Sequence, residues 1–379
     1  LPLLTSIFIQ NKRTCGNKIL VLVIVLVGNA LFMLLEYETT LIKLNLQNKK
    51  PYNRFSLDDK RLIPEIEKKY FLRNGEIPYM YFFFIKEFLR IHYYKTYLFD
   101  YKKVDASIIL QYDDNNYAYA QNKNLVIIFV ESFDKLVVNY KIGNKEICPI
   151  FNTLANDSSN IVSFFKVQKR IGGSSDAHMM VNTGLLPLLK NMSVAFIVDG
   201  EVPALAKALK WNNSFVVTTD SKNFWNQYYT SLYYGYKENH HDLLIKNKLH
   251  CKQVIDGDVF LYGADIIRNS KEPFISQFVT IAMHQPFEHV QDKTDWIMEA
   301  DSLDIDVRKY LNCAHYFDKC LGEFLQALKD NGKYNNTVIA IMGDHCVHNK
   351  EFKIHSGYCP IVILNSGCPK ELIPHPQNM

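Results

Sequence analysis

Polar side chains that can bind a metal ion follow three apolar runs of this 379-residue chain. They are Glu131 after NLVIIFV (124–130), His284 after PFISQFVTIAM (273–283), and Asp344 with His345 after TVIAIM (337–342). Taken singly, each has an ordinary explanation as a helix cap, a solvated acid or a hydrogen-bonded loop histidine. Together, a carboxylate and an Asp-His pair at strand ends supply the ligands that a divalent-metal hydrolase needs.

The glycine-rich stretch RIGGSSDAHMMVNTGLLP (170–187) contains the candidate nucleophile, Ser174. Gly172 and Gly173 let the backbone approach a phosphate group closely, and Ser174 is predicted to open a helix. A hydroxyl at the amino end of a helix can attack phosphorus, because the helix dipole and a coordinated cation both favour its alkoxide. The alternative is that Ser-Ser-Asp only caps the helix.

The elements that must position these residues are buried strands that alternate with helices. Besides the three runs above, SFVVTT (214–219) and PIVILN (360–365) are predicted strands, and 301–330 has apolar residues at helical spacing. Near-continuous apolar strands are buried on both faces of a sheet. The pattern therefore predicts an α/β fold with a mostly parallel central sheet sandwiched by helices, in a domain that covers 121–379.

Composition excludes some functions. The net charge of +4 comes from 43 basic and 39 acidic residues without a basic block, so no nucleic-acid partner is expected. The eight cysteines show no CxxC pair and no zinc-finger spacing. Disulfides and buried free thiols both remain open for them, and the sequence supplies no pairing.

The amino-terminal part is predicted to be membrane-embedded. Residues 19–35, ILVLVIVLVGNALFMLL, form an uncharged run long enough to span a bilayer, and they predict a transmembrane helix within a membrane segment at 1–36. The basic loop before it places the following residues outside the cytoplasm by the positive-inside rule. Residues 37–120 are predicted to be a linker with an amphipathic helical region. Both ends of the chain are expected to be truncated.

Six ordered motifs resemble a known family. NLVIIFVESF, GGSSDA, FWNQ, MHQPF, YLNCAHYFDKCLGEFL and NNTVIAIMGDH are similar to those of the lipoteichoic acid synthase and phosphoglycerol transferase branch of the sulfatase and alkaline phosphatase superfamily. The resemblance covers roughly 122–368. It implies an alkaline phosphatase-like fold and an enzyme that acts as a phosphotransferase or a hydrolase.

The resemblance also implies roles for the candidate residues. Glu131, Ser174, Asp344 and His345 are expected to hold one divalent cation, and Ser174 is expected to be the nucleophile. This oxygen-rich set suits manganese or magnesium better than a thiolate-seeking metal, with manganese favoured and zinc an alternative. His284 matches a catalytic histidine that contacts the substrate phosphate and protonates the leaving alcohol.

The expected substrate pocket departs from the family pattern. Trp225 and Gln227 of FWNQ are the expected substrate-binding residues together with His284, but Gln227 stands where phosphoglycerol-transferring members commonly have Arg. A neutral amide lacks the bidentate grip of Arg on a phosphate. Thr218 likewise stands about where those members often have His. Three further histidines are candidates for a second metal site or for substrate binding without a family counterpart: His178, His348 and His355.

The function that the resemblance implies is transfer of a phosphoglycerol-like headgroup from a membrane phospholipid to an envelope glycan or lipid, through a phospho-serine intermediate. The enzyme is expected in the cell membrane with its catalytic domain outside the cytoplasm. One alternative is a phosphodiesterase, phosphatase or sulfatase-like hydrolase that uses water as acceptor. GGSSDA lacks the CxPSR-like context of a sulfatase proper. A third hypothesis is a catalytically inactive, membrane-tethered binding domain.

Overall fold

The computed structural model describes residues 119–369 and Gly28, except for eight internal stretches: 167, 171, 188–192, 196–202, 220–226, 241–254, 291–292 and 348–355. Contacts divide the chain into two units, 1–104 and 105–379, and the account below concerns the second. The predicted span at 19–35 and the predicted linker at 37–120 lie almost wholly outside the described residues. No helix in the described part is long and apolar enough to cross a membrane.

A seven-stranded sheet forms the centre of the described domain, in the order β4-β9-β8-β1-β7-β5-β6. Its strands are β1 (Asn124–Val130), β4 (Ile161–Phe165), β5 (Asn213–Thr218), β6 (Glu238–His240), β7 (Phe274–Val279), β8 (Thr337–Gly343) and β9 (Cys359–Leu364). Neighbours from β8 to β6 pair in parallel, whereas β9 pairs antiparallel with both β8 and β4. The prediction of a mostly parallel sheet is confirmed.

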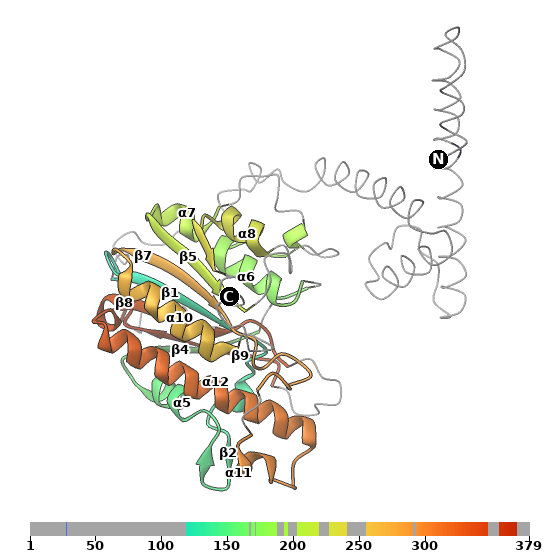
Figure 1. The fold of residues 1–379 in the computed structure, drawn as a ribbon. Coiled ribbons are helices and arrows are strands. Elements are labelled where there is room, and N and C mark those ends of the chain that lie inside the picture. The colour runs from blue at the N-terminus through green and yellow to red at the C-terminus, as the bar shows by residue number, and fades with distance from the viewer. Residues whose placement is uncertain are drawn as a thin grey trace, which may run out of the picture. The chain divides into compact units, whose positions relative to one another are not determined.

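Helices connect the strands and cover the sheet. The α-helices are α5 (Pro149–Asn156), α6 (Ser174–Thr183), α7 (Leu205–Leu209), α8 (Gln227–Tyr234), α10 (Asp256–Asn269), α11 (Asp295–Met298) and α12 (Ile305–Asp330). Short 3-10 helices are η4 (Lys135–Val137), η5 (Ser193–Ala195) and η8 (Tyr334–Asn336), and a small hairpin joins β2 (Lys141–Ile142) to β3 (Lys145–Glu146). Figure 1 shows α5, α10 and α12 on one side of the sheet and α6, α7 and α8 on the other.

Alternation along β1 divides its side chains between two cores. Val126, Ile128 and Val130 pack with residues of α5, α10 and α12. Ile127 and Phe129 pack with residues of α6, α7 and α8. All five side chains are at most 2% exposed, so the strand is buried on both faces, as its continuous apolar run predicts.

The seven-stranded sheet contains two strands that the sequence patterns did not predict. β4 (Ile161–Phe165) lies at one edge of the sheet and all five of its residues are only partly buried. β6 (Glu238–His240) lies at the opposite edge and is three residues long. β4, with the sequence IVSFF, is apolar but short and only partly buried, and β6, with the sequence ENH, is too short and polar for a local pattern to reveal it.

Candidate metal centre and nucleophile

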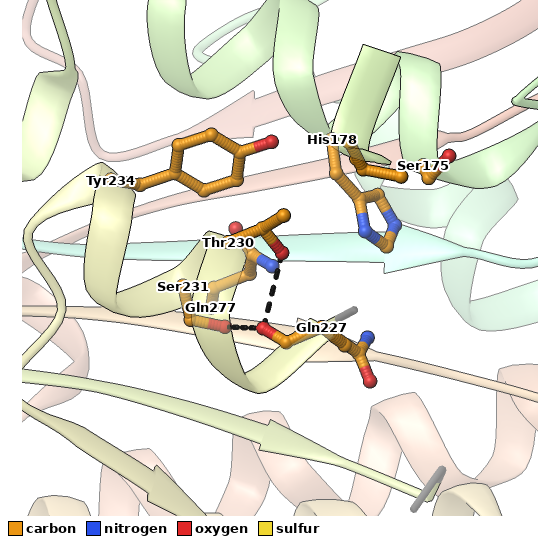
Figure 2. A pocket seen from close by; sticks show the side chains of 8 residues that line it. Ser175, His178, Gln227, Thr230, Ser231, Tyr234 and Gln277 are labelled. Atoms are coloured by element: carbon orange, nitrogen blue, oxygen red, sulfur yellow. Dashed lines mark hydrogen bonds between the residues drawn. The ribbon is translucent and has the colours of Figure 1, made fainter. Parts of the chain in front are cut away.

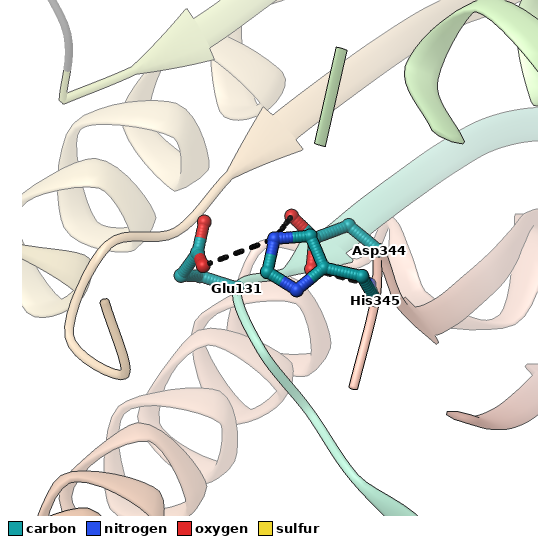
Figure 3. Close-up of side chains that lie close together, drawn as sticks. All are labelled: Glu131, Asp344 and His345. Atoms are coloured by element: carbon teal, nitrogen blue, oxygen red, sulfur yellow. Dashed lines mark hydrogen bonds and ion pairs between the residues drawn. The ribbon is translucent and has the colours of Figure 1, made fainter. Parts of the chain in front are cut away.

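Glu131 and Asp344 lie side by side because they follow neighbouring parallel strands in register. Val130, the last residue of β1, pairs with Gly343, the last residue of β8. The backbone N–H of Asp344 donates to the Val130 carbonyl at 3.2 Å, which continues the ladder by one step. Glu131, Asp344 and His345 each offer one ligand atom, and these atoms lie within 4.8 Å of one another. Figure 3 shows the three side chains facing one another at the ends of the two strands.

Ser174 lies close to this group, although it belongs to a separate segment of the chain. It is the first residue of α6, and its hydroxyl lies 3.3 Å from Glu131 Oε2 and 3.1 Å from His345 Nε2. The Ser174 side chain is buried, with 3% exposure. A carboxylate and an imidazole can therefore both reach the hydroxyl proton, while the amino end of α6 favours negative charge on the oxygen.

The backbone fixes which nitrogen of His345 is available. Nδ1 lies 3.0 Å from the carbonyl oxygen of Cys346. Because a carbonyl oxygen only accepts, Nδ1 carries a proton in this contact. In the neutral ring, Nε2 then presents a lone pair toward Glu131 Oε1 at 3.4 Å and Asp344 Oδ2 at 3.8 Å. This is the arrangement of an imidazole ready to bind a metal ion.

Neighbouring groups hold the two carboxylates in place. The Ser132 hydroxyl donates to Glu131 Oε1 at 2.6 Å, and the Ser132 backbone N–H donates to Asp344 Oδ1 at 2.9 Å. Ser132 has a φ of 52°, which is uncommon for a residue with a side chain. The Glu131 backbone N–H donates to Thr280 Oγ1 at 3.0 Å, so the residue after β7 supports the end of β1. Nothing in the sequence pattern distinguished Ser132 or Thr280.

Two glycines are required by the local geometry. Gly173 precedes α6 with φ of 60° and ψ of −125°, a conformation that side-chain-bearing residues avoid. A Cβ on Gly343 would lie 2.4 Å from the Phe133 carbonyl oxygen and 3.0 Å from the Cβ of Cys359. Asp176 fixes the loop before α6, in which Gly173 lies, because its Oδ2 accepts from the backbone N–H groups of Arg170 at 2.9 Å and Gly172 at 2.8 Å.

The donor set fits a divalent cation. Glu131 and Asp344 are 3% and 1% exposed, and the lone pair of His345 Nε2 faces both. Two buried carboxylates beside a neutral imidazole repel one another unless positive charge lies between them. Lys169, in the segment before Ser174, interacts electrostatically with both acids. Burial lowers the pKa of the Lys169 amine, and Asp344, Cys346 and Glu131 act in the opposite direction.

The sequence places His284 directly after a strand that ends at Met283, but β7 ends at Val279, so His284 lies in the turn that follows, with residues 280–283 between. It is half-buried, and its Nδ1 donates to the Gln285 carbonyl at 2.7 Å. Its ring centroid lies 5.9 Å from that of His289. The pKa of His289 is lowered, first by burial and then by the neighbouring His284. Contact of His284 with a substrate stays a prediction.

Gln227 is buried at the start of α8 and lines a small polar pocket. Figure 2 shows this pocket, whose lining residues are Ser175, His178, Val194, Gln227, Thr230, Ser231, Tyr234 and Gln277. No lining side chain carries a fixed charge. Gln227 is 4% exposed, and neither atom of its amide has a hydrogen-bond partner within the described ranges. Trp225 lies outside the described residues.

Of the other sequence candidates, His178 and Thr218 lie in the described part of the chain. His178 is buried in the pocket wall, its ring centroid is 4.3 Å from that of Phe129, and burial lowers its pKa to about 4. Within the described part of the chain, the group of Glu131, Asp344 and His345 is the cluster of metal-binding type, and it does not include His178. Thr218 is fully buried at the end of β5. His348 and His355 lie outside the described residues.

Comparison with known proteins shows the family. The sulfatase family profile matches residues 123–358, which is more than half of the chain. The chain therefore belongs to the sulfatase family, and its relatives place it with the lipoteichoic acid synthase-like branch that the motifs resemble.

Two bacterial relatives illustrate the similarity. Lipoteichoic acid synthase 1 of Bacillus subtilis is 29% identical over 237 residues, and lipoteichoic acid synthase of Staphylococcus aureus is 30% identical over 240 residues. Each alignment covers 60% of this chain and 36% of the relative. The chain thus spans little more than a third of the length of these relatives.

Solved structures share the fold. A lipoteichoic acid synthase of Listeria monocytogenes has a TM-score of 0.59 at 23% identity, covering 66% of this chain and 68% of the other. A phosphoglycerol transferase of Streptococcus pyogenes, in complex with sn-glycerol-1-phosphate, has a TM-score of 0.50 at 16% identity, covering 69% and 72%. At these identities the similarity concerns the fold alone.

Proposed function

We propose that this chain contains the catalytic domain of a membrane-anchored phosphotransferase that moves a phosphoglycerol-like headgroup from a membrane phospholipid to an envelope glycan or lipid. The observation that carries the proposal is the position of the Ser174 hydroxyl, 3.1 Å from His345 Nε2 and 3.3 Å from Glu131 Oε2 at the amino end of α6. The lipoteichoic acid synthases among the relatives support the substrate class.

Glu131, Ser174, Asp344 and His345 would hold one divalent cation, with manganese first and magnesium or zinc as alternatives, since three oxygen donors accompany one imidazole. Bound there, such a cation supplies positive charge that offsets the negative charge developing on phosphate oxygens. Ser132 and Thr280 hold Glu131 and Asp344 in register for this role.

Ser174 acts as the nucleophile. Its Oγ loses its proton to Glu131 and forms a bond to phosphorus as the bond from phosphorus to the lipid alcohol breaks, which leaves the headgroup phosphate esterified to Ser174 as a phospho-serine. His284 protonates the departing alcohol. In the second displacement the acceptor hydroxyl attacks the phospho-serine and Ser174 is released. The same residues would hydrolyse the substrate if water took the place of the acceptor.

Trp225, Gln227 and His284 bind the headgroup in this proposal. Gln227 offers an amide donor and acceptor in place of a cation, so it favours hydroxyl groups over a second anionic group. The membrane segment at 1–36, the linker at 37–120 and the catalytic domain at 121–379 complete the proposed organisation. The catalytic domain would face the outside of the cell membrane, where lipid donor and envelope acceptor meet.

The test uses purified protein, manganese and labelled phosphatidylglycerol, with phosphatidylethanolamine and a simple phosphodiester as competing donors. We expect a labelled phospho-ester at Ser174 by mass spectrometry and preference for the glycerol headgroup. Ser174→Ala should abolish turnover and the label while leaving part of the metal binding. Thr183→Ala, which removes a hydroxyl bonded to the Met179 carbonyl at the far end of α6, should retain turnover.

Each alternative predicts a different result in this experiment. Release of the headgroup to water with every acceptor would favour the hydrolase. Absence of bound divalent ion after manganese loading would favour the inactive binding domain. Full activity of Ser174→Ala would refute the assignment of the nucleophile.

A further inference from the structure

Two cysteine sulfurs face each other beside the metal centre. Cys346 follows His345 directly, Cys359 is the first residue of β9, and their Sγ atoms lie 3.6 Å apart. Cys359 is fully buried, whereas Cys346 is partly exposed. Three other cysteines in the described ranges lie against carbonyl oxygens instead, namely Cys148 against Ala314, Cys313 against Phe287 and Cys368 against Pro369, and Cys320 contacts the side chain of Tyr316.

Both cysteines adjoin the residues that are proposed to bind the metal ion. The Cys346 carbonyl accepts the proton of His345 Nδ1, so movement of Cys346 acts on the ring that faces Glu131. Cys359 packs against the end of β8, since a Cβ on Gly343 would lie 3.3 Å from Cys359 Sγ. One thiol thus adjoins a proposed ligand, and the other belongs to the sheet.

We propose that Cys346 and Cys359 form a reversible disulfide that ties the segment bearing Asp344 and His345 to β9. A disulfide has a sulfur–sulfur distance of about 2.0 Å, so the two sulfurs must approach by roughly 1.6 Å. Cys359 is held by the ladder of β9 and by the Tyr358 carbonyl, which accepts from the Lys135 backbone N–H at 2.8 Å. The movement therefore falls on the partly exposed Cys346.

The oxidant is a low-molecular-weight disulfide or a disulfide-bearing oxidoreductase. The Cys346 sulfur attacks the oxidant disulfide, forming a mixed disulfide and releasing one thiol. The Cys359 sulfur then attacks Cys346 Sγ, which closes the protein disulfide and releases the second thiol. The two cysteines lose two electrons and two protons, and the oxidant gains both. The proposed location outside the cytoplasm is a compartment in which such bonds persist.

The bond would restrain the metal-binding segment. A fixed Cys346 carbonyl holds His345 in its ligand orientation, so the oxidised protein should bind manganese about tenfold more tightly than the reduced protein. Closing the loop also restricts the unfolded chain and should raise Tm by about 5–10 °C. The effect on metal affinity rests on the proposed function, whereas formation of the bond does not.

The experiment begins with the purified full chain in glutathione buffers that range from fully reduced to fully oxidised. Free thiols are then alkylated, and peptides are mapped by mass spectrometry without reduction. We expect a linked peptide pair containing Cys346 and Cys359, which disappears on reduction. Alkylation of both cysteines at every glutathione ratio, or a glutathione adduct that persists on Cys346, would overturn the proposal.

Variants and metal titration separate the two parts of the proposal. Cys346→Ser should lose the linked peptide and the rise in Tm, while Cys368→Ser should retain both. Calorimetric titration with manganese should show the tenfold difference between the oxidised and reduced forms of the unaltered chain. Equal affinities would overturn the coupling to the metal site. If neither form binds manganese, the proposed function fails, and the peptide map still decides whether the disulfide forms.

Discussion

Two pairs of buried carboxylates serve different purposes in this domain. Glu131 and Asp344 are 3% and 1% exposed at the ends of β1 and β8, while Asp256 on α10 and Asp318 on α12 are 0% and 1% exposed on the other side of the sheet. Asp256 Oδ1 accepts from the backbone N–H groups of Ile281 at 2.7 Å and Ala282 at 3.0 Å. Within the described residues, neither Asp256 nor Asp318 belongs to a group of side chains that could hold a metal ion.

Asp318 shows the structural role most clearly. Its two oxygens accept from the backbone N–H groups of Ile150 at 2.9 Å and Phe151 at 2.7 Å, which are orphan donors at the start of α5. Nearby His315 donates from Nδ1 to the Ile147 carbonyl at 2.7 Å. These contacts link α12 to the start of α5, so both residues have a structural role.

Burial of an acid therefore does not by itself mark a functional site. Asp256 and Asp318 each accept hydrogen bonds from backbone N–H groups of one adjoining segment. Glu131 and Asp344 instead lie close to His345, and the Ser174 hydroxyl lies close to both Glu131 and His345. Only the second arrangement leaves several ligand atoms directed at a common position.

Asp344→Asn should weaken manganese binding by about 100- to 1,000-fold, or roughly 3–4 kcal/mol, because it removes one buried negative charge opposite the cation. The amide oxygen can still accept from Ser132 and His345, so the fold should persist. Isothermal titration measures the affinity. The same change at Asp318 serves as the control and should leave manganese affinity unaltered. Equal losses at the two positions would abolish the distinction between the pairs.

Asp318→Ala should lower the free energy of unfolding by about 3 kcal/mol, because two N–H groups at the start of α5 lose their acceptor. Urea denaturation measures this loss, and manganese titration of the folded variant should give the unaltered affinity. Glu323→Ala, at an exposed position on the same helix, should change stability little. A stable Asp318→Ala protein with impaired metal binding would assign Asp318 to the site instead.

Asp256 should make stability depend on pH. Burial raises its pKa from 3.8 to about 6, so between these values the unfolded chain releases the proton before the folded chain does. The contribution of Asp256 to stability is thus greatest below pH 4 and declines as pH rises toward 6. Relative to the unaltered protein, Asp256→Asn should gain about 2 kcal/mol of stability between pH 4 and pH 7. Urea denaturation across this range would contradict the prediction if the two proteins gave parallel curves.

Thr280→Val should weaken manganese binding by about tenfold, or roughly 1.4 kcal/mol, because the Glu131 backbone N–H loses its acceptor and the carboxylate loses a support. Thr337→Val is the matched control. Thr337 is also fully buried, and it accepts from Asn124 Nδ2 at 3.3 Å at the opposite end of β1. That variant should lose stability without losing metal affinity. Identical titration curves for Thr280→Val and the unaltered protein would show that Thr280 does not position Glu131.

The agreement between sequence and structure is uneven along the sheet. The buried strands β1, β7 and β8 follow from their apolar runs, and the places of Glu131 and Asp344 follow from the ends of β1 and β8, whereas β7 ends at Val279, before the end of the run that precedes His284. The edge strands β4 and β6 escape prediction because both are short, β4 is only partly buried and β6 consists of polar residues. Support of Glu131 by Thr280 depends on an atom-level contact across the sheet, which no local pattern encodes.

The amino-acid sequence alone indicates the mostly parallel α/β architecture, the strand ends at which Glu131 and Asp344 lie and the serine at the start of α6, because burial on two faces and helix initiation leave local patterns. Tertiary structure decided which nitrogen of His345 faces the carboxylates, which buried acids merely cap backbone and which two of the cysteines meet. These outcomes depend on distances of a few ångströms between segments far apart in the chain. The register of β1 and β8 brings Glu131 beside Asp344, and contacts between other segments decide the rest, so spacing along a single segment cannot encode them.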